Sequence, residues 1–278
     1  MAKTLVVGAN GTVGSTLVAL LAAKGETVLR ATSKQAQKAG EVHLNVATGA
    51  GRAAAFAGVS RAFLLSPPGF TNQDELMIPL VDAAKAAGVA KIVLMTAMGA
   101  NADENSPMRK AERHLEKSGL AYNIVRPNWF MQNFNSYWIA SILAEGKIRL
   151  PVGTAKGSFI DARDIAAVAA ELLTTNRFDG QAFDLTGSEA LDHDQAAAIL
   201  ARETGKKIVF EEITPEAMLK GLIGTGLPQA YSEFLIVILG YFKAGYAARI
   251  ESSVETITGK KPITFAAYAK DHRAAWLG

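Results

Sequence analysis

Residues 7–14 read Val-Gly-Ala-Asn-Gly-Thr-Val-Gly, and they connect an apolar run at 4–7 to an apolar helical pattern at 13–24. In a strand–loop–helix unit, the first glycine of such a loop permits a tight turn and the second lets the backbone approach a pyrophosphate. The third lets the helix pack closely on the strand. The helix N-terminus also presents unpaired N–H groups and a positive dipole end to phosphates. The stretch therefore predicts a dinucleotide-binding loop.

Six residues of this loop are predicted to contact the phosphates, mostly through backbone N–H groups. They are Gly8, Asn10, Gly11, Thr12, Val13 and Gly14. The alternative is a glycine-rich turn without a ligand. Because every glycine costs conformational entropy, a plain turn is expected to contain fewer of them.

Short apolar runs alternate with helical patterns through the rest of the first half. The predicted strands are 27–31, 41–44, 62–65, 91–95 and 122–125, and the predicted helices are 73–87 and 108–117. Such alternation is typical of a parallel sheet covered by helices on both faces. We therefore expect an α/β fold of Rossmann type, with a doubly wound parallel sheet.

The pattern loosens after Asn128. Helices are predicted at 133–143, 161–174, 192–204, 215–222, 228–244 and 264–276, and short strands at 148–150, 182–185 and 207–210. No repeat or linker separates this half from the first. We predict a single domain over 1–278, with the nucleotide part mainly in 1–150. A smaller C-terminal α/β substrate lobe is predicted mainly in 128–160 and 180–278.

Composition narrows the possible functions. The 278 residues are 49% hydrophobic and 20% charged, with a net charge of +3 and no cysteine, which excludes disulfides and thiol catalysis. The sequence contains no dense run of Lys and Arg, so nucleic-acid binding is not favoured. The longest apolar run, 234–242, is far shorter than the roughly 20 residues of a membrane-spanning helix. The N-terminal residues show no apolar leader, so we expect a cytoplasmic protein, either a monomer or a homodimer.

The second predicted strand indicates which dinucleotide is bound. NAD sites place an acidic residue about 20 residues after the loop, on the ribose hydroxyls. Here 29–34 reads Leu-Arg-Ala-Thr-Ser-Lys, without an acid. Ser33 and Lys34, with Arg30, are suited to a 2′-phosphate, although each could also be a solvated surface residue. The segment favours NADP(H) over NAD(H).

Residues at the ends of the later strands complete the predicted cofactor site. Asn45 and Val46 are placed to meet adenine, or alternatively to cap a strand end. Ser66 and Pro67 would face a ribose, or form a stiff turn. The remaining candidates follow the fifth and sixth strands or lie on the helix between them: Thr96, Lys110 and Pro127.

Catalytic residues are not evident. None of the six tyrosines is followed four residues later by the lysine of the Tyr-x-x-x-Lys proton relay, although Lys110 could be a surviving lysine. The aromatic and amide side chains after the sixth strand suit a flat apolar substrate. The predicted substrate pocket is Met98, Asn128, Trp129, Phe130 and Asn133. Trp129 and Phe130 could instead belong to the core.

The remaining histidines and acidic residues that could suggest a site are interpreted as structural. The four histidines are scattered without metal-ligand spacing, and no metal site is predicted. His193, between two aspartates, is expected on the surface at a helix start. Asp161 and Asp164 share one face of a helix start, where capping and the helix dipole favour acids.

The motifs at 8–14, 118–133, 159–165 and 183–187 together resemble the NmrA-like branch of the atypical short-chain dehydrogenases, over nearly the full length. That branch contains NADPH-dependent triphenylmethane-dye, quinone and azo-dye reductases that lack Tyr-x-x-x-Lys. It also contains non-catalytic redox-sensing regulators. The chain departs from some relatives at Asn45, where an acid is common.

The resemblance implies that Gly8, Gly11, Thr12 and Gly14 hold the phosphates and that Lys34 or its neighbours hold the 2′-phosphate. It implies that the loop after Arg126 lines the nicotinamide and substrate. We therefore expect an NADPH-dependent oxidoreductase that transfers hydride to a small, flat, conjugated aromatic acceptor, such as a quinone, an azo dye or a triphenylmethane dye. The alternative is a non-catalytic NADP(H) sensor. The aromatic helix 228–244 would cover the substrate crevice, or form core or an oligomer interface; its aromatic residues are Tyr231, Phe234, Tyr241 and Phe242.

Overall fold

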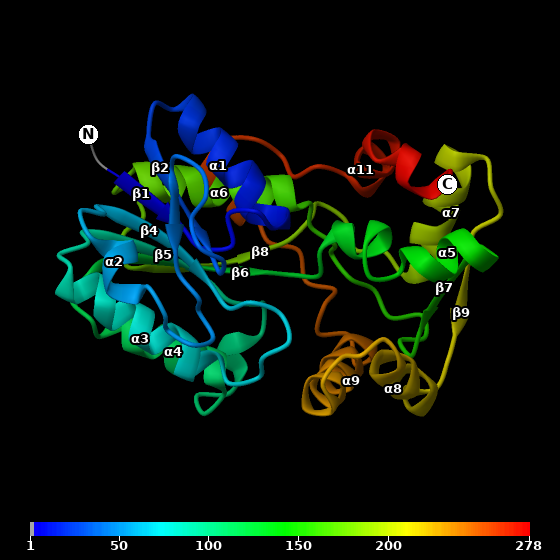
Figure 1. Ribbon diagram of the computed structural model, residues 1–278. Helices are drawn as coiled ribbons and strands as arrows, with labels where there is room; N and C mark the ends of the chain where they lie inside the picture. The colour runs from blue at the N-terminus through cyan, green and yellow to red at the C-terminus, as the bar shows by residue number, and fades with distance from the viewer. Residues whose placement is uncertain (1–2) are drawn as a thin grey trace. The chain divides into compact units, whose positions relative to one another are not determined.

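The computed structural model describes residues 3–278, and the chain divides into two compact units. Unit 1 consists of Met1–Pro127, Arg163–Leu185 and Thr256–Gly259. Unit 2 consists of Asn128–Ala162, Thr186–Glu255 and Lys260–Gly278. The chain therefore passes between the two units several times, as the change of colour along the ribbon shows (Figure 1).

Unit 1 is built on a seven-stranded sheet with the order β3-β2-β1-β4-β5-β6-β8, in which every neighbouring pair is parallel. The strands are β1 Lys3–Val6, β2 Thr27–Thr32, β3 Glu41–His43, β4 Arg61–Leu65, β5 Lys91–Met95, β6 Ala121–Pro127 and β8 Gln181–Leu185. This order is that of a doubly wound Rossmann sheet, which confirms the predicted fold class.

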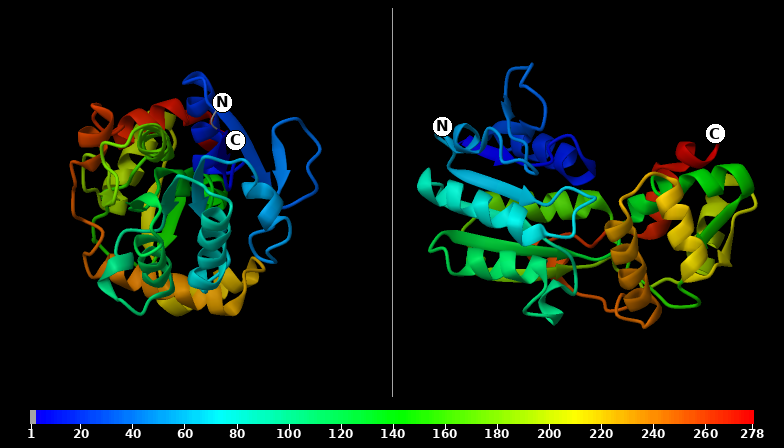
Figure 2. Two further views of the ribbon diagram at one scale, coloured as in Figure 1. Left: turned by 90° about the vertical axis from the view of Figure 1, so that its left-hand side faces the viewer. Right: turned by 60° about the horizontal axis from the view of Figure 1, so that its bottom comes forward.

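Helices cover both faces of this sheet. They are α1 Thr12–Ala23, α2 Arg52–Phe56, α3 Gln73–Ala86, α4 Pro107–Glu116 and α6 Ala162–Thr174. α1 and α6 lie on one face, and α3 and α4 lie on the other (Figures 1 and 2). The α3 face is apolar because Leu76, Leu80 and Val81 recur at helical spacing, and all three are buried against the sheet. Lys24, which follows α1, forms an ion pair with Glu171 on α6 at 3.0 Å.

Strand β8 differs from its predicted place. The sequence assigns 182–185 to the C-terminal lobe, but the strand pairs in parallel with β6 and forms one edge of the main sheet. Its first residues are exposed, as an edge strand permits, so the strand lacks the continuous apolar run of the central strands. The short helix α2 has no counterpart among the predicted elements.

Unit 2 contains a two-stranded parallel sheet of β7 Lys147–Leu150 and β9 Val209–Glu212. Its helices include α5 Ile139–Glu145, α7 His193–Thr204, α8 Pro215–Gly224, α9 Gln229–Lys243, α10 Ser253–Thr258 (which ends in unit 1) and α11 Phe265–Asp271. Two 3₁₀ helices, Met131–Asn135 and Arg273–Trp276, occupy parts of the predicted helices 133–143 and 264–276. On α9, Phe242 is buried, whereas Tyr241 is 58% exposed.

The core of unit 2 is aromatic and encloses a histidine. His193 is 1% exposed, and its ring packs against Phe134, Trp138 and Phe159 at centroid distances of 5.9, 5.6 and 5.4 Å. The predicted surface position is therefore wrong. Asp192 caps α7, so the next residue turns inward, onto the face that buries Ala196, Ala197 and Leu200.

Burial lowers the pKa of His193 to about 4, and neither ring nitrogen has a hydrogen-bond partner within residues 3–278. The unfolded chain binds a proton near pH 6.5, so the stability that neutral His193 confers is lost as pH falls from about 6.5 to about 4. We expect unfolding titrations to show a loss of about 3 kcal/mol over this window that is absent in His193→Leu. Phe210→Leu, which removes an uncharged ring beside His193, should keep the wild-type pH dependence. Equal slopes in wild type and His193→Leu would contradict this assignment.

Candidate functional site

The carboxyl ends of the parallel strands meet at one edge of the sheet in unit 1. The predicted cofactor residues that follow these strands are the glycine loop after β1, Ser33 and Lys34 after β2, Asn45 and Val46 after β3, Ser66 and Pro67 after β4, Thr96 after β5, and Pro127 at the end of β6. The sheet order reverses between β1 and β4, and ligands of open α/β sheets bind outside the strand ends at such a point.

The glycine loop has the geometry of a phosphate cradle. Gly8 has φ +71°, and the N–H of Gly11 donates to Gly8 O at 2.8 Å, which closes the turn. A Cβ on Gly14 would lie 2.1 Å from Gly8 O, so α1 packs against the turn only with glycine there. No side chain caps α1, and its first turn holds no acid. Val13 and Gly14 are buried, so a ligand would meet their backbone N–H groups.

Of the predicted 2′-phosphate residues around the end of β2, Lys34 is a cation that remains available. Arg30 lies 3.8 Å from Glu41 on β3, and its guanidinium donates to Ala39 O at 3.5 Å. Glu41 is in turn held by the N–H groups of Gln37 and Lys38, and these bonds lower the pKa of its carboxyl. Lys34 is exposed and forms no ion pair within 3–278. Ser33 and Lys34, rather than Arg30, are therefore the groups available for a 2′-phosphate.

Asn45 closes the loop after β3. Its Oδ1 accepts the N–H of Thr48 at 3.1 Å, and its own N–H donates to Ala50 O at 2.9 Å. The side-chain oxygen therefore has the capping role that the sequence left open, and an adenine contact stays a prediction for its amide nitrogen. Val46 is half-buried and packs on the core of unit 1.

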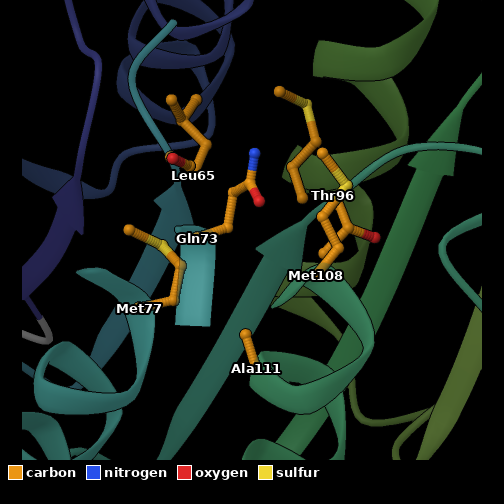
Figure 3. Close-up of a pocket in the computed structure, with 8 residues that line it drawn as sticks. Leu65, Gln73, Met77, Thr96, Met108 and Ala111 are labelled. Atoms are coloured by element: carbon orange, nitrogen blue, oxygen red, sulfur yellow. The ribbon is translucent and has the colours of Figure 1, made fainter. Parts of the chain in front are cut away.

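A small cavity of about 70 Å³ adjoins Thr96 at the ends of β4 and β5 (Figure 3). Its lining consists of Leu65, Ser66, Gln73, Met77, Met95, Thr96, Met108 and Ala111. The α4 residues that reach this cavity are thus Met108 and Ala111, neither of which can transfer a proton.

Lys110 is placed elsewhere on α4. It is exposed and lines a surface groove with Ile78, Arg113 and Lys117. Its neighbours Arg109 and Ala111 are the buried residues of that turn, so Lys110 points to the opposite side of the helix. The prediction that a surviving lysine meets the cofactor is therefore corrected.

Beneath Thr96 lies a buried ionic cluster centred on Glu112, which is 0% exposed. Its carboxylate accepts from Arg126 Nε at 2.8 Å and Nη2 at 2.7 Å, from Arg109 Nη1 at 2.9 Å and from Thr96 Oγ1 at 2.7 Å. Burial alone would raise the pKa of Glu112, but the hydrogen bonds from Arg126 and Thr96 hold it below its usual range. Glu112 is therefore an anion that fixes both Thr96 and Arg126.

The predicted substrate residues divide between the two units. Met98, in unit 1, is half-buried, and its N–H donates to Pro127 O at 3.0 Å. In unit 2, Asn128 is 5% exposed and donates to Ser158 Oγ at 2.6 Å and Ala247 O at 2.8 Å. Both amide hydrogens of Asn128 thus hold the loop, which corrects its predicted role as a substrate-orienting donor.

Trp129, Phe130 and Asn133 are half-buried in unit 2. The Trp129 ring stacks on Trp138 at 6.4 Å and meets the edge of Phe242 at 5.6 Å, so it packs on the aromatic core while keeping an exposed part. One part of the Trp129 side chain therefore belongs to the core, as one interpretation expected. The exposed part remains available as a pocket wall, as the other expected.

Sequence reasoning missed Gln73, Glu112 and Arg126. A signal was present on α4, because Glu112 falls on the same helical face as Ala111 and Leu115 and so occupies a core position. A charged residue at a core position requires a partner of opposite charge. Arg126 is a charged residue inside an otherwise apolar strand, and it is therefore the expected partner of Glu112. Asp161, by contrast, precedes α6 and accepts from Gln132 Nε2 at 3.0 Å, in line with a structural role.

Over residues 3–278, no group of three or more His, Asp or Glu side chains is arranged to hold a metal ion. In the same part of the chain, no helix is long and apolar enough to span a membrane.

Known proteins resemble this chain in both sequence and structure. The model of the NmrA-like family matches residues 1–269. An NAD(P)H azoreductase from Xenophilus azovorans is 34% identical, with 98% of each chain covered. Two solved structures superpose with a TM-score of 0.83: a triphenylmethane reductase from Citrobacter sp. complexed with NADP(H), at 20% identity, and an NADPH-dependent quinone oxidoreductase complexed with NADPH from Escherichia coli, at 21%. Each covers 96% of this chain and 99% of the other.

The negative transcriptional regulator NmrA in complex with NAD superposes with a TM-score of 0.75 at 17% identity, covering 97% of this chain and 95% of the other. These structural likenesses, at low identity, show the shared fold.

Proposed function

This chain belongs to the NmrA-like family, and we propose that it is an NADPH-dependent reductase that transfers hydride to a flat, conjugated acceptor such as a quinone, an azo dye or a triphenylmethane dye. Its assignment as an NAD(P)H-dependent oxidoreductase is supported by the azoreductase relative, which matches over 98% of the chain. The observation that carries the finer proposal is the surface beside Thr96, where α4 presents Met108 and Ala111.

The residues present suit a dinucleotide. The uncapped N-terminus of α1, with the exposed Gly11 in front of it, would receive the pyrophosphate, and Lys34 would pair with the 2′-phosphate. When bound, the reduced nicotinamide supplies two electrons and a proton as hydride. The protein contributes position and a largely apolar surface.

The α4 residues that line the cavity, Met108 and Ala111, favour one class of acceptor. An aldehyde or ketone becomes an alkoxide on reduction and needs a positioned proton donor. A quinone becomes a stabilised phenolate, and a triphenylmethane cation accepts hydride without any proton. An azo nitrogen can take its proton from water. Met108 and Ala111 are compatible with the last three acceptors and unfavourable for the first.

Steady-state NADPH oxidation across a panel of quinones, azo dyes and triphenylmethane dyes tests this proposal. We expect turnover with at least one conjugated acceptor and little with simple aldehydes or ketones. Cofactor binding without turnover of any acceptor would refute the reductase and favour a non-catalytic redox sensor. The same assay with NADH measures the cofactor preference.

Lys34→Ala should lower the ratio of NADPH to NADH efficiency by about tenfold, or about 1.4 kcal/mol, because one charge-assisted contact to the 2′-phosphate is lost. The matched control is Lys3→Ala, at the start of β1 and therefore at the opposite edge of the sheet. The control should leave the ratio unchanged. An unchanged ratio in Lys34→Ala would remove this lysine from the site.

A further inference from the structure

Asn10 and Gly11 form the only Asn-Gly pair in the sequence, and both residues are exposed in the glycine loop. When glycine follows asparagine, the next backbone nitrogen reaches the side-chain carbonyl carbon most easily, because glycine has no Cβ to obstruct the approach. The other nine asparagines of the chain precede larger residues. The loop therefore contains a sequence that is chemically suited to deamidation.

The Asn10 side chain is not held in place by the protein. Within residues 3–278 it makes no hydrogen bond. By contrast, Asn45 Oδ1 accepts the N–H of Thr48 at 3.1 Å, and Asn72 Nδ2 donates to Glu75 Oε2 at 2.6 Å. Such bonds must break before an amide can turn toward the next backbone nitrogen. The Asn10 amide turns without that loss.

The nitrogen of Gly11, which would attack the amide, lies at the start of α1. Its N–H donates to Gly8 O at 2.8 Å, and this bond must open before the nitrogen can react. The space around Gly11 is otherwise open, because a Cβ there would have only Gly8 O within 4 Å. The positive end of the α1 dipole favours the negative charge that develops when the nitrogen loses its proton. The bond to Gly8 thus slows the reaction, and the helix end promotes it.

We propose that Asn10 is a deamidation site whose modification blocks the phosphate loop. Gly11 N gives its proton to hydroxide and bonds to Asn10 Cγ. The Cγ–Nδ2 bond breaks, and the NH₂ group takes a proton from water and leaves as ammonia. Water then opens the resulting succinimide at one of its two carbonyls, which gives aspartate or isoaspartate. No oxidant or reductant is required, since the net change replaces ammonia by water.

Both products place a carboxylate beside the N-terminus of α1. No side chain caps this helix and its first turn holds no acid, so the new carboxylate would compete with a pyrophosphate for the same N–H groups. Conversely, a bound pyrophosphate would cover the loop and keep Gly11 N from reacting. This consequence, unlike the deamidation itself, rests on the proposed function. Protein that holds cofactor is protected, and free protein gradually loses its affinity.

Peptide mass spectrometry of the full chain, incubated at mildly alkaline pH with and without NADPH, tests the modification. Asn105 is the reference within the same digest, because it is also exposed but precedes Ser106. Free protein should convert Asn10 at least about tenfold faster than Asn105, since serine carries the Cβ that glycine lacks. The rate should rise with pH, and saturating NADPH should slow it several-fold. Conversion of Asn10 no faster than that of Asn105 would overturn the proposal.

Asn10→Asp supplies the aspartate product directly. It should weaken NADPH binding, measured by fluorescence titration, by at least about tenfold through repulsion of the pyrophosphate. Asn10→Ser removes the amide without adding charge and should stay within about threefold of wild type. Asn176→Asp makes the same charge change at an exposed residue between α6 and β8, at the opposite edge of the sheet, and should leave the affinity unchanged.

The outcomes separate this inference from the proposed function. Wild-type affinity in Asn10→Asp would overturn the blocking of the loop. Equal conversion of Asn10 with and without bound NADPH would overturn the protection. If wild type binds no NADPH, the proposed function fails, whereas the comparison of Asn10 with Asn105 still decides whether the site is modified.

Discussion

Glu112→Ala is expected to lower the free energy of unfolding by about 3–5 kcal/mol. The substitution leaves Arg126, with a side chain 8% exposed, and Arg109, with a side chain 10% exposed, without their shared carboxylate. Among residues 3–278, Arg109 retains Glu104 and Glu116 as acidic partners, whereas Arg126 retains only the more distant Asp184, at 3.7 Å. The penalty is therefore mainly that of an inadequately paired arginine inside the sheet. Urea unfolding of the full chain measures it.

The control is Glu171→Ala, which breaks the ion pair with Lys24 in the same unit. Both side chains of that pair are more than a third exposed, at 44% and 38%, so the change should stay within about 1 kcal/mol. If the two substitutions cost the same, the Glu112 cluster would be solvated in solution, and the orientation of Thr96 would lose its support.

Gly11→Val is expected to weaken cofactor binding by at least about a hundredfold, or about 2.7 kcal/mol, while the fold is retained. Gly11 is exposed, and a Cβ there would lie 3.2 Å from Gly8 O, a tight contact that a small shift of the loop relieves. The two methyl groups would then occupy the space in front of the α1 N-terminus, where the pyrophosphate is proposed to lie. Binding is measured by titration of NADPH fluorescence, and the fold by circular dichroism.

Gly221→Val adds the same side chain at a helix position of α8 with nothing within 4 Å. It should leave cofactor affinity unchanged. Full affinity in Gly11→Val would show that the loop is not the phosphate site. Loss of structure in that variant would instead show that the contact with Gly8 cannot relax.

The sequence predicted the nucleotide half of the fold well because its signals are local. Strand β1, the glycine loop and α1 are consecutive, so their apolar runs and glycines are sufficient to identify a phosphate-binding turn. Strand β8 was assigned to the wrong lobe because its place depends on pairing with β6, more than 50 residues earlier. No local pattern reports such a partner.

The site was predicted less completely, for a physical reason that Lys110 and Gln73 illustrate. Both are polar residues on helices beside the sheet edge, but Gln73 lines the cavity and Lys110 lines a surface groove. Successive residues of a helix point about 100° apart, so a small error in the helix orientation moves a side chain from a cavity wall to a solvated face. Asn128 shows the converse. Its amide type suits a substrate contact, yet its hydrogen bonds to Ser158 and Ala247 consume its donors, and these partners are distant in sequence.

The division of the sheet among separated segments has a consequence for biosynthesis. β6 ends at Pro127, but its outer neighbour β8 begins only at Gln181, after a long excursion through unit 2. While the chain emerges from the ribosome, β6 therefore waits as an open edge with unpaired N–H and C=O groups. Translation of the intervening residues is therefore an interval in which this nascent protein is open to wrong strand pairing, and in which a chaperone would be of use to it.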